Sequence, residues 1–429
     1  MGLGKTLQAI ALMLESADGG AALVVTPASV LGNWQSEVRR FAPSLNVLVC
    51  ATSEAVQRAL KAGAGDVVLV TYGLLAANSR QIAGRTWQTA ILDEAHAIKS
   101  RGTKMSQASR MIKAEARVLL TGTPLQNHVS ELWPLVEFAT PGLFGSYAAF
   151  CARFAVPIEK ERDRPRQHLL RRLLAPFMLR RTKDDVLDEL PEKTELDVRV
   201  DLSEPERALY ESLRERACNQ LQTGEVNTMQ ALAELTRLRL AACHPKLVDA
   251  SLEYASTKSE VFMRIAGDLI QTGHRALVFS QFTSHLALIR AELDRAGIGY
   301  QYLDGATPAA ERLELVERFN KGRTPLFLIS LKAGGTGLNL TGADYVVHLD
   351  PWWNPAVEDQ ASDRAYRIGQ TRPVTIYRLI AAGTIEEKIL RLHASKKTMA
   401  DALLEGTDMA SRLGREEILE LLAAASAAD

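Results

Sequence analysis

The chain has 429 residues, of which 47% are hydrophobic, and this length is enough for two or three globular domains. Its 51 basic and 51 acidic side chains balance, so no net field attracts the whole molecule to nucleic acid or to a membrane, and any polyanion site must be a local patch. The four cysteines lie far apart without a C-x-x-C pair, which fits a reducing cytoplasm and argues against structural zinc, and no apolar run approaches the length of a membrane span.

The chain begins with Met-Gly-Leu-Gly-Lys-Thr, which is the second half of a phosphate-binding loop. The full loop reads G-x-x-x-x-G-K-[ST] and normally follows a buried strand. Backbone N–H groups of the loop and of the helix it opens face the phosphates, while the lysine neutralises their charge. We therefore predict Gly2, Gly4 and Lys5 as nucleotide contacts, Thr6 as a Mg²⁺ ligand, and a helix that begins near Lys5. A chance Gly-rich loop is the alternative.

Four short apolar runs in the first third of the chain each end in polar or turn residues, and helical patterns separate them. This arrangement is typical of a parallel sheet whose two faces are both covered. The predicted strands are Leu23 to Thr26, Val67 to Val70, Ala90 to Leu92 and Val118 to Leu120.

Two adjacent carboxylates, Asp93 and Glu94, follow the third of these runs in the segment ILDEAH. Ligands of open α/β sheets bind just beyond the carboxyl ends of the strands. There Asp93 would complete the Mg²⁺ shell, and Glu94 would orient or deprotonate an attacking water. A solvated acidic turn is the alternative, and the Lys-Thr loop upstream argues against it. Thr121 and Thr123 follow the fourth run, where they either link this site to a second one or simply cap the strand, which is the simpler interpretation.

From about Pro141 to Ser256 no strand series appears, and the abundance of Arg, Glu and Leu predicts mostly helices. After Thr384, apolar residues recur at helical spacing and predict a helical tail whose stripe packs into a core; they are Ile385, Ile389 and Leu392. Between these segments a second strand series is predicted at Ala276 to Phe279, Leu326 to Ile329, Tyr345 to Leu349 and Val374 to Tyr377.

The second strand series is accompanied by two cationic or phosphate-binding candidates. Arg364 and Arg367 are spaced i and i+3, which predicts that they share one helix face. Pointing across a cleft, they would act as arginine fingers on a γ-phosphate, and ordinary solvated arginines are the alternative. A Gly-rich turn, from Lys332 to Asn339 and including Gly335 and Gly337, would bind phosphate either of a nucleotide or of a nucleic-acid backbone.

The motifs together resemble the Swi/Snf-type branch of superfamily-two helicase-like ATPases, which are DNA translocases and chromatin remodellers. The resemblance covers almost the whole chain in the right order. It is carried by MGLGKT, VVTPASVLGNWQSEVRRF, VTYGLL, DEAH, LTGTPLQNHVSELWPLVEF, LRRTKDDVLDELPEKTE, LVFSQFT, LDGAT, LISLKAGGTGLNLTGADYVVHLDPWWNP and DRAYRIGQ.

This resemblance implies an α/β fold with two RecA-like lobes, each with a parallel sheet, and ATP with Mg²⁺ between them. The expected divisions are a first ATP-binding lobe at 1–140, a helical insertion and linker at 141–255, a second helicase C-terminal lobe at 256–382, and a helical tail at 383–429 that braces the first lobe. Duplex DNA is expected to lie across both lobes, which step along one strand as they close on ATP and reopen.

The resemblance also implies contacts to DNA phosphates and grooves, which give sequence-independent, salt-dependent binding. The matching residues are Thr26, Pro27, Asn33, Trp34, Thr71, Tyr72, Ser280, Gln281, Lys332, Gly334 and Trp353. For Trp353 a core aromatic is the alternative, and for Trp352 it is the preferred one. Basic residues of the helical insertion either widen the DNA footprint or form a solvated face; they are Arg162, Arg164, Arg166, Arg171, Arg172, Arg180 and Arg181.

In this family pattern an adenine-contacting segment, an acidic stretch and a central strand precede MGLGKT. Because that strand is central, we expect its absence to leave a gap between neighbouring strands, with unpaired backbone groups that each cost about 1–3 kcal/mol. The sequence therefore predicts that Met1 is an internal methionine, and mass spectrometry of the native protein tests this.

We expect a DNA-dependent ATPase, in the cytoplasm and associated with the nucleoid of a bacterium, that translocates on double-stranded DNA and displaces a bound protein such as RNA polymerase or a nucleoid protein. No membrane partner is expected. A strand-separating helicase is one alternative, although no separation wedge can be identified. A non-hydrolysing remnant that only binds DNA or a partner is the other, and the retention of Lys5, Asp93, Glu94, Arg364 and Arg367 argues against it.

Overall fold

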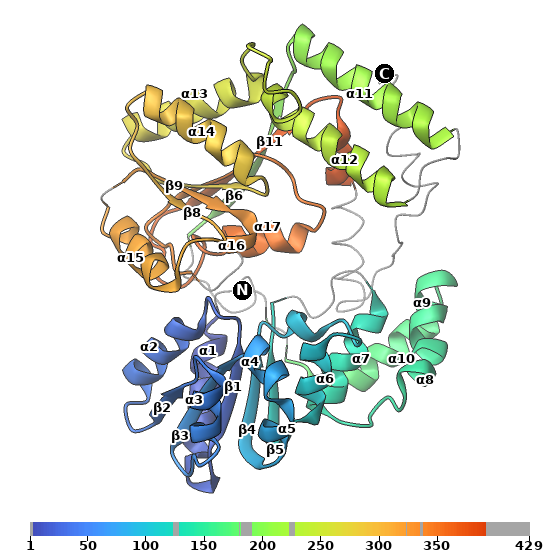
Figure 1. Ribbon diagram of the computed structural model, residues 1–429, viewed down its shortest axis with the longest axis vertical. Helices are drawn as coiled ribbons and strands as arrows, with labels where there is room; N and C mark the ends of the chain where they lie inside the picture. Colours follow the sequence, from blue (N-terminus) through green and yellow to red (C-terminus); the bar gives the residue numbers. More distant parts are fainter. Residues whose placement is uncertain are drawn as a thin grey trace. The chain divides into compact units, whose positions relative to one another are not determined.

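The computed structural model describes residues 3–122, 128–179, 181, 191–222, 228–322, 324–334 and 338–391. Contacts divide these residues into two compact units, one reaching to residue 181 and the other running from residue 191 to 391 (Figure 1). Each unit contains a parallel sheet with helices packed on it, which confirms the predicted α/β class with two parallel-sheet lobes. Among the described helices, none combines the length and the apolar character that a bilayer crossing requires.

The first unit is built on a five-stranded sheet with the order β2-β3-β1-β4-β5. All four predicted strands are present, and β2 is an addition. The strands are β1 (Ala22–Thr26), β2 (Asn46–Val49), β3 (Asp66–Thr71), β4 (Thr86–Asp93) and β5 (Lys113–Leu120). The helices are α1 (Lys5–Glu15), α2 (Leu31–Phe41), α3 (Ser53–Ala59), α4 (Tyr72–Ala77), α5 (Ser79–Ala83), α6 (Lys104–Met111), α7 (Leu132–Ala139), α8 (Tyr147–Phe150), α9 (Val156–Lys160) and α10 (Arg164–Leu174). Single turns of other helix types occur at η1 (Ala17–Gly19), η2 (Ala95–Ile98), η3 (Val129–Glu131), η4 (Cys151–Ala155) and η5 (Ala175–Phe177).

Both faces of the first sheet are buried, because successive side chains of a strand point to opposite faces. In β1, Val24 packs with α1 and α2, whereas Leu23 and Val25 pack with α4 and α5 on the other face. The predicted helix after the phosphate loop is confirmed as α1, which buries Ala9, Ile10 and Met13. This two-sided packing explains why the strands appear in the sequence as nearly continuous apolar runs.

β5 is the edge strand of this sheet, and it pairs only with β4 among the described strands. Val118 and Leu119 near its end are only half-buried. The five strands pair without interruption, so the expectation of a gap between neighbouring strands was wrong. The physical reason is the strand order, because β1 pairs directly with β3 on one side and with β4 on the other. Beyond β4 the described sheet ends at β5, whose outer edge has no strand partner among the described residues.

The second unit is built on a six-stranded parallel sheet with the order β6-β11-β10-β7-β9-β8. The second predicted strand series is confirmed in full. The strands are β6 (Lys193–Val200), β7 (Ala276–Ser280), β8 (Tyr300–Leu303), β9 (Leu326–Ser330), β10 (Tyr345–His348) and β11 (Val374–Ala381). The helices are α11 (Glu204–Gln222), α12 (Thr228–Cys243), η6 (Pro245–Leu247), α13 (Thr257–Gln271), α14 (Thr283–Arg295), α15 (Ala309–Asn320), α16 (Leu331–Gly334) and α17 (Pro355–Ser362).

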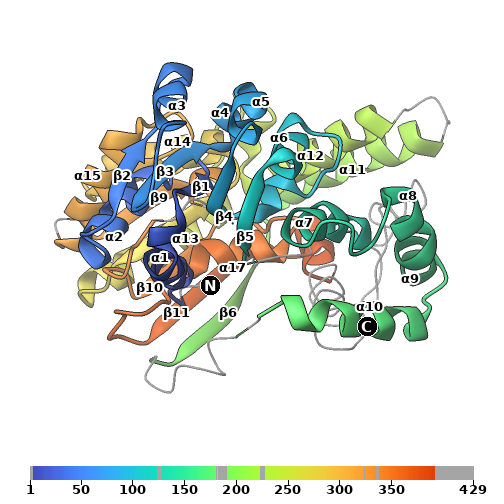
Figure 2. The ribbon, with the colours of Figure 1, turned by 90° about the horizontal axis from the view of Figure 1, so that it is seen from below.

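The segment predicted to be mostly helical also supplies a strand, β6, which pairs in parallel with β11 at the edge of the second sheet (Figure 2). Of the helices in this segment, α8 to α10 belong to the first unit, and α11 and α12 belong to the second. The proposed domain boundaries at residues 140, 255 and 382 stay a prediction.

Helices cover the second sheet on both faces as well. α13 and α14 pack on one side, and α15, α16 and α17 contribute to the core on the other (Figure 1). α11 and α12 form a separate apolar cluster with Ile385, which is 1% exposed. The helical tail is described only to residue 391, where it is helical from residue 385, and Leu392 lies outside the described residues.

Candidate functional site

Three adjacent strands of the first sheet end at the same edge. β3, β1 and β4 are neighbours, and their last residues are Thr71, Thr26 and Asp93. Lys5, the first residue of α1, lies close enough to interact electrostatically with Asp93. The fold therefore brings together the lysine and the carboxylate that the sequence singles out, although they are far apart along the chain.

Asp93 is a buried carboxylate with only a few donors around it. It is 8% exposed; the Trp34 indole N–H donates to its Oδ2 over 2.7 Å, and the backbone N–H of Glu94 donates to its Oδ1 over 2.9 Å. Burial and the charge of Glu94 raise the pKa of Asp93 to about 6, although the Trp34 hydrogen bond and the Lys5 charge act in the opposite direction. A carboxylate has about four lone-pair sites, so these two donors leave acceptor capacity for a cation.

Glu94 turns the chain sharply at the end of β4. Among the described residues, it and Arg162 are the only non-glycine residues with positive φ, and the φ of Glu94 is 47°. An L-residue in this left-handed region costs about 1–2 kcal/mol, a strain that structures usually retain at functional sites. The turn leads into η2, and it places Oε2 of Glu94 3.4 Å from Nδ1 of His96. Two successive carboxylates thus lie at one strand end, and the charge of Glu94 acts on Asp93.

The first turn of α1 is suited to an anion. Gly4 precedes the helix with φ 71°, and a Cβ there would meet nothing within 4 Å, so the backbone conformation rather than space demands glycine. Within the described residues no side chain caps the helix, so the first N–H groups of α1 remain available to a phosphate. Lys5 and Thr6 are half-buried at this end, and Gly2 lies outside the described residues.

Trp34 and Tyr72, which the resemblance assigns to DNA contact, face the interior instead. Trp34 on α2 is 0% exposed and holds Asp93, and the Tyr72 hydroxyl donates to the Asp93 carbonyl oxygen over 2.7 Å. Trp34 therefore binds the carboxylate of Asp93 and Tyr72 binds its backbone carbonyl, and together they fix the end of β4. No spacing rule in the sequence relates Trp34 or Tyr72 to Asp93, so sequence reasoning missed this positioning role.

The other residues of the first unit assigned to DNA have mixed surroundings. Thr26 is fully buried, and its hydroxyl has no hydrogen-bond partner in the described part of the chain. Thr71 accepts from the backbone N–H of Leu74 and caps α4, while Asn33 donates to Glu37 one turn along α2. Pro27 is half-buried. Thr121 is half-buried directly after β5, and Thr123 lies outside the described residues.

The prediction that Arg364 and Arg367 share a helix face was wrong. α17 ends at Ser362, and the two arginines lie in the turns that follow. Arg364 is 7% exposed, its carbonyl accepts from the backbone N–H of Leu340, and Arg367 donates to the Leu338 carbonyl over 3.5 Å.

The side chain of Gln370 explains this early helix end. Its amide N–H₂ donates to the carbonyl oxygens of Ala343 over 2.7 Å and of Ala365 over 3.1 Å. Its oxygen accepts from the backbone N–H groups of Thr371 and Arg372. The bond to Ala343 ties this turn to a distant part of the chain, and Gly369 with φ 99° completes the turn.

In the second unit, the residues assigned to DNA surround a buried aspartate. Ser280, 1% exposed, donates its hydroxyl proton to Asp350, and the backbone N–H of Gln281 donates to Oδ1 of the same residue over 3.2 Å. Trp353 is half-buried, with its ring 5.2 Å from the Arg239 guanidinium. Trp352 packs against the core of the second sheet. Lys332 and Gly334 lie in α16, and the predicted phosphate contacts Gly335 and Gly337 lie outside the described residues.

Comparisons with known proteins agree with these motifs. Residues 1–247 match the model of the SNF2-related domain, and residues 257–369 match the helicase conserved C-terminal domain. A Bacillus subtilis protein described as a putative ATP-dependent helicase/translocase, YwqA, is 39% identical over 98% of this chain and 48% of its own length. The human SWI/SNF-related matrix-associated actin-dependent regulator of chromatin subfamily A member 1 is 36% identical over 98% of this chain and 43% of its own length.

Among solved structures, the Sulfolobus solfataricus SWI2/SNF2 ATPase core in complex with dsDNA is 32% identical, with 96% of this chain and 92% of that chain covered and a TM-score of 0.44. The chain spans about half, or less, of the length of the curated relatives it matches. The family models together reach from the phosphate loop to Gly369, so they include both the Asp93 edge of the first sheet and the Arg364 turn of the second unit.

Proposed function

The chain belongs to the SNF2-related family, whose model matches its residues 1–247, and from this premise we propose that it hydrolyses ATP to translocate on double-stranded DNA and to displace proteins bound there. The observation that carries the proposal is the edge of the first sheet. There an uncapped helix N-terminus with Lys5 lies near a buried, cation-accepting Asp93 and a strained Glu94. This combination suits a nucleoside triphosphate with its metal ion.

The first turn of α1 would hold the triphosphate. Its free N–H groups and the positive end of the helix attract anionic oxygens, and the Lys5 ammonium supplies a full positive charge. Thr6 follows directly, and its hydroxyl would be a ligand of the metal ion. Since charge stabilisation and positioning dominate phosphoryl transfer, removing Lys5 should remove most of the activity.

Asp93 fits a magnesium site. Oxygen donors are what Mg²⁺ prefers, and the carboxylate keeps acceptor capacity beyond the bonds from Trp34 and Glu94. Bound Mg²⁺ would neutralise charge that develops on the phosphates. Trp34 and Tyr72 hold Asp93 at both its carboxylate and its carbonyl, which limits its movement. Glu94, which follows directly with a left-handed backbone conformation, would orient or deprotonate an attacking water.

The second unit supplies cations for the transition state in this proposal. Arg364 and Arg367 keep the role of arginine fingers, now carried by a hydrogen-bonded turn rather than a helix face. Such a turn fixes the backbone around both residues. Loss of an arginine finger typically lowers turnover by 10³–10⁵-fold, roughly.

DNA binding rests on the family and on local basic surface, since the chain has no net charge. Arg164, Arg166, Arg171 and Arg172 are exposed on α10, a basic helix of the first unit. Contacts of this kind go to phosphates and carry no sequence preference, so binding should weaken steeply with salt. The buried positions of Trp34, Tyr72 and Ser280 lead us to propose positioning roles for them rather than direct contact with DNA.

The proposal is tested by ATP hydrolysis with and without duplex DNA. We expect turnover that duplex DNA stimulates, that falls at least about 100-fold in Lys5→Ala, and that is unchanged in Lys61→Ala, a control lysine on the exposed surface of the first unit. If the wild-type chain binds duplex DNA but hydrolyses ATP no faster than Lys5→Ala, the chain is not a motor and only binds DNA or a partner. Strand separation of a forked duplex under the same conditions would favour the helicase alternative.

A further inference from the structure

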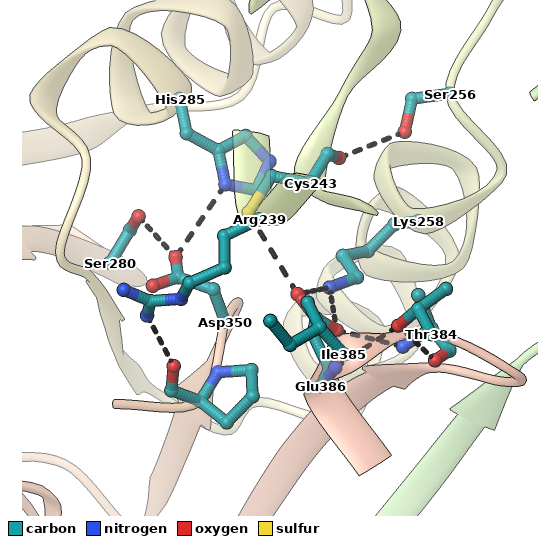
Figure 3. A network of polar contacts seen from close by, with 12 residues as sticks. Arg239, Cys243, Ser256, Lys258, Ser280, His285, Asp350, Thr384, Ile385 and Glu386 are labelled. Carbon is teal, nitrogen blue, oxygen red and sulfur yellow. Dashed lines mark hydrogen bonds and ion pairs between the residues drawn. The ribbon is translucent and has the colours of Figure 1, made fainter. Parts of the chain in front are cut away.

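Three side chains able to bind metal meet inside the second unit, and none of them is used above for nucleotide chemistry. They are Cys243 at the end of α12, His285 in α14 and Asp350 just beyond β10 (Figure 3). All three are buried, and their candidate ligand atoms lie within 4.8 Å of one another. The cluster joins two helices and a strand that are far apart in sequence.

His285 is the member that points to a missing ligand. It is 0% exposed, and neither ring nitrogen has a hydrogen-bond partner within the described part of the chain. The nearest carboxylate oxygen, Oδ2 of Asp350, is 3.7 Å from Nδ1, which is beyond hydrogen-bonding distance. A buried polar group without a partner costs about 1–3 kcal/mol, so an imidazole in this position is better explained if it binds something.

The charges around the cluster leave room for a dication. Lys258 and Glu386 neutralise each other, with Nζ 2.7 and 2.6 Å from the two carboxylate oxygens. Arg239 donates to the Pro351 carbonyl over 2.7 Å, and its guanidinium lies over the rings of Phe282, Trp352 and Trp353. A Cys243 thiolate and the Asp350 carboxylate would together offset the two charges of a divalent ion, and the Arg239 guanidinium would stay as one further positive charge over the aromatic rings.

We propose that Cys243, His285 and Asp350 form a structural zinc site in the second unit. Sulfur, imidazole nitrogen and carboxylate oxygen are the ligand types that Zn²⁺ accepts, in tetrahedral geometry. Ligand atoms around tetrahedral zinc lie roughly 3.5 Å apart, so ligand atoms that now lie within 4.8 Å of one another must approach by about 1.3 Å at most. A water molecule or the Ser280 hydroxyl, which already touches Asp350, supplies the fourth position.

Zinc binding would exchange a proton for the metal. The Cys243 thiol now lies 3.9 Å from Oε1 of Glu386, as Figure 3 shows. When the Zn–S bond forms, the thiol proton leaves to solvent, so affinity should fall as the pH is lowered. The bound ion would tie α12 and α14 to the end of β10, next to the Trp352–Trp353 segment.

The spacing of the cysteines in the sequence does not indicate this zinc site. The sequence contains no C-x-x-C pair, which argued against structural zinc, but here a single cysteine lies beside a histidine and an aspartate that only the fold brings together. The site goes beyond the proposed ATPase function and can be tested without nucleotide or DNA.

The test is the zinc content of the untagged full chain, purified from zinc-supplemented medium, dialysed against a weak chelator, and measured by inductively coupled plasma mass spectrometry. We expect about one zinc per chain in the wild type, and at least a tenfold loss in Cys243→Ser and His285→Gln, roughly the scale of weakened zinc ligation. Cys50→Ser is the matched control, because Cys50 is equally buried but lies in the first unit. A wild-type chain without zinc, or equal zinc in all variants, overturns the proposal.

A second measurement needs only the wild-type chain. Titration with Co²⁺ as the probe should give the intense visible absorption of a tetrahedral site and a thiolate-to-metal charge-transfer band, and one equivalent of Zn²⁺ should remove both. If Co²⁺ gives only the weak spectrum of a hydrated ion, the site does not exist. This result stands even where Cys243→Ser fails to fold.

Discussion

Each sheet has a buried aspartate at the carboxyl end of an interior strand, and the pKa values of the two aspartates shift in opposite directions. Asp93 ends β4 in the first unit, and Asp350 follows β10 in the second. They are 8% and 3% exposed. Burial and Glu94 raise the pKa of Asp93 to about 6. Burial alone would also raise the pKa of Asp350, but His285, Ser280 and Arg239 outweigh it and hold that pKa below its usual value.

The difference lies in the neighbours, since strand position and burial are nearly the same. Asp350 faces a hydroxyl, a backbone N–H and positive charge. Asp93 also has one side-chain donor, one backbone N–H and the charge of Lys5, but the carboxylate of Glu94 beside it and its burial outweigh them. In the metal-free chain, Asp350 thus has protein groups that stabilise its charge, whereas the charge of Asp93 is left to be stabilised by what binds there. That is the electrostatic arrangement expected of a substrate site.

The largest change in stability should come from breaking the buried ion pair of Lys258 and Glu386 in the second unit. Lys258→Met leaves Glu386 buried without its partner, since both side chains are 1% exposed, and should lower the free energy of unfolding by about 3–5 kcal/mol. The double variant Lys258→Met/Glu386→Leu should recover most of this loss, although Glu386 also accepts from the backbone N–H of Ala381. Hydrogen exchange of β11 measures both changes within the unit. A single variant as stable as the wild type would contradict the pairing.

Asp93→Asn should instead raise the free energy of unfolding. The folded-state pKa of Asp93, about 6, lies above the unfolded value of 3.8, so the folded state holds the extra proton between these values and its stability falls as the pH rises through them. Above pH 6 the ionised carboxylate costs up to about 3 kcal/mol without bound cation. Asparagine removes that cost. Metal-free and nucleotide-free Asp93→Asn should therefore be the more stable chain at pH 8 and equal to the wild type near pH 4, by urea unfolding.

Asp350→Asn is the matched control for that experiment. Because the folded-state pKa of Asp350 is lowered, its carboxylate contributes stability above the unfolded value of 3.8, and this contribution disappears as the pH falls below it. In the metal-free chain, the variant should be less stable than the wild type at neutral pH, with the difference shrinking in acid. The same sign for both variants at pH 8 would mean that the two aspartates do not differ as described.

Trp34→Phe should give the smallest effect. It keeps the buried ring but removes the donor to Asp93, a hydrogen bond to a charged group worth about 1.5–3 kcal/mol. The pKa of Asp93 should rise further, so the acid limb of the ATPase pH profile should move to higher pH. Trp87→Phe, whose indole N–H donates to the Ile82 carbonyl on the other face of the sheet, is the control and should leave the profile in place. A shift in both variants would exclude a specific role for Trp34.

The sequence predicted what apolar runs and local motifs determine. Strands such as β1 and β9 are buried on both faces and were predicted, whereas β6, which is mostly exposed and rich in charged residues, was not. Asp93 was placed correctly at a strand end because the strand precedes it directly. Its position at the end of a strand can therefore be predicted from the neighbouring residues alone.

Long-range contacts explain the errors. The helix through Arg364 ends early because Gln370 binds the carbonyl of Ala343 from a distant loop. Trp34 faces Asp93 across the sheet edge, and Cys243, His285 and Asp350 meet only after the second sheet has formed. None of these relations has a period or spacing that a single sequence displays.

The central claim is movement along duplex DNA powered at the Asp93 edge, and displacement of a triplex-forming oligonucleotide from duplex DNA tests it most directly. With ATP and Mg²⁺ the chain should release the third strand while the duplex stays paired, and Lys5→Ala and Glu94→Gln should not release it. Release without ATP, or by Lys5→Ala at the wild-type rate, would contradict the account.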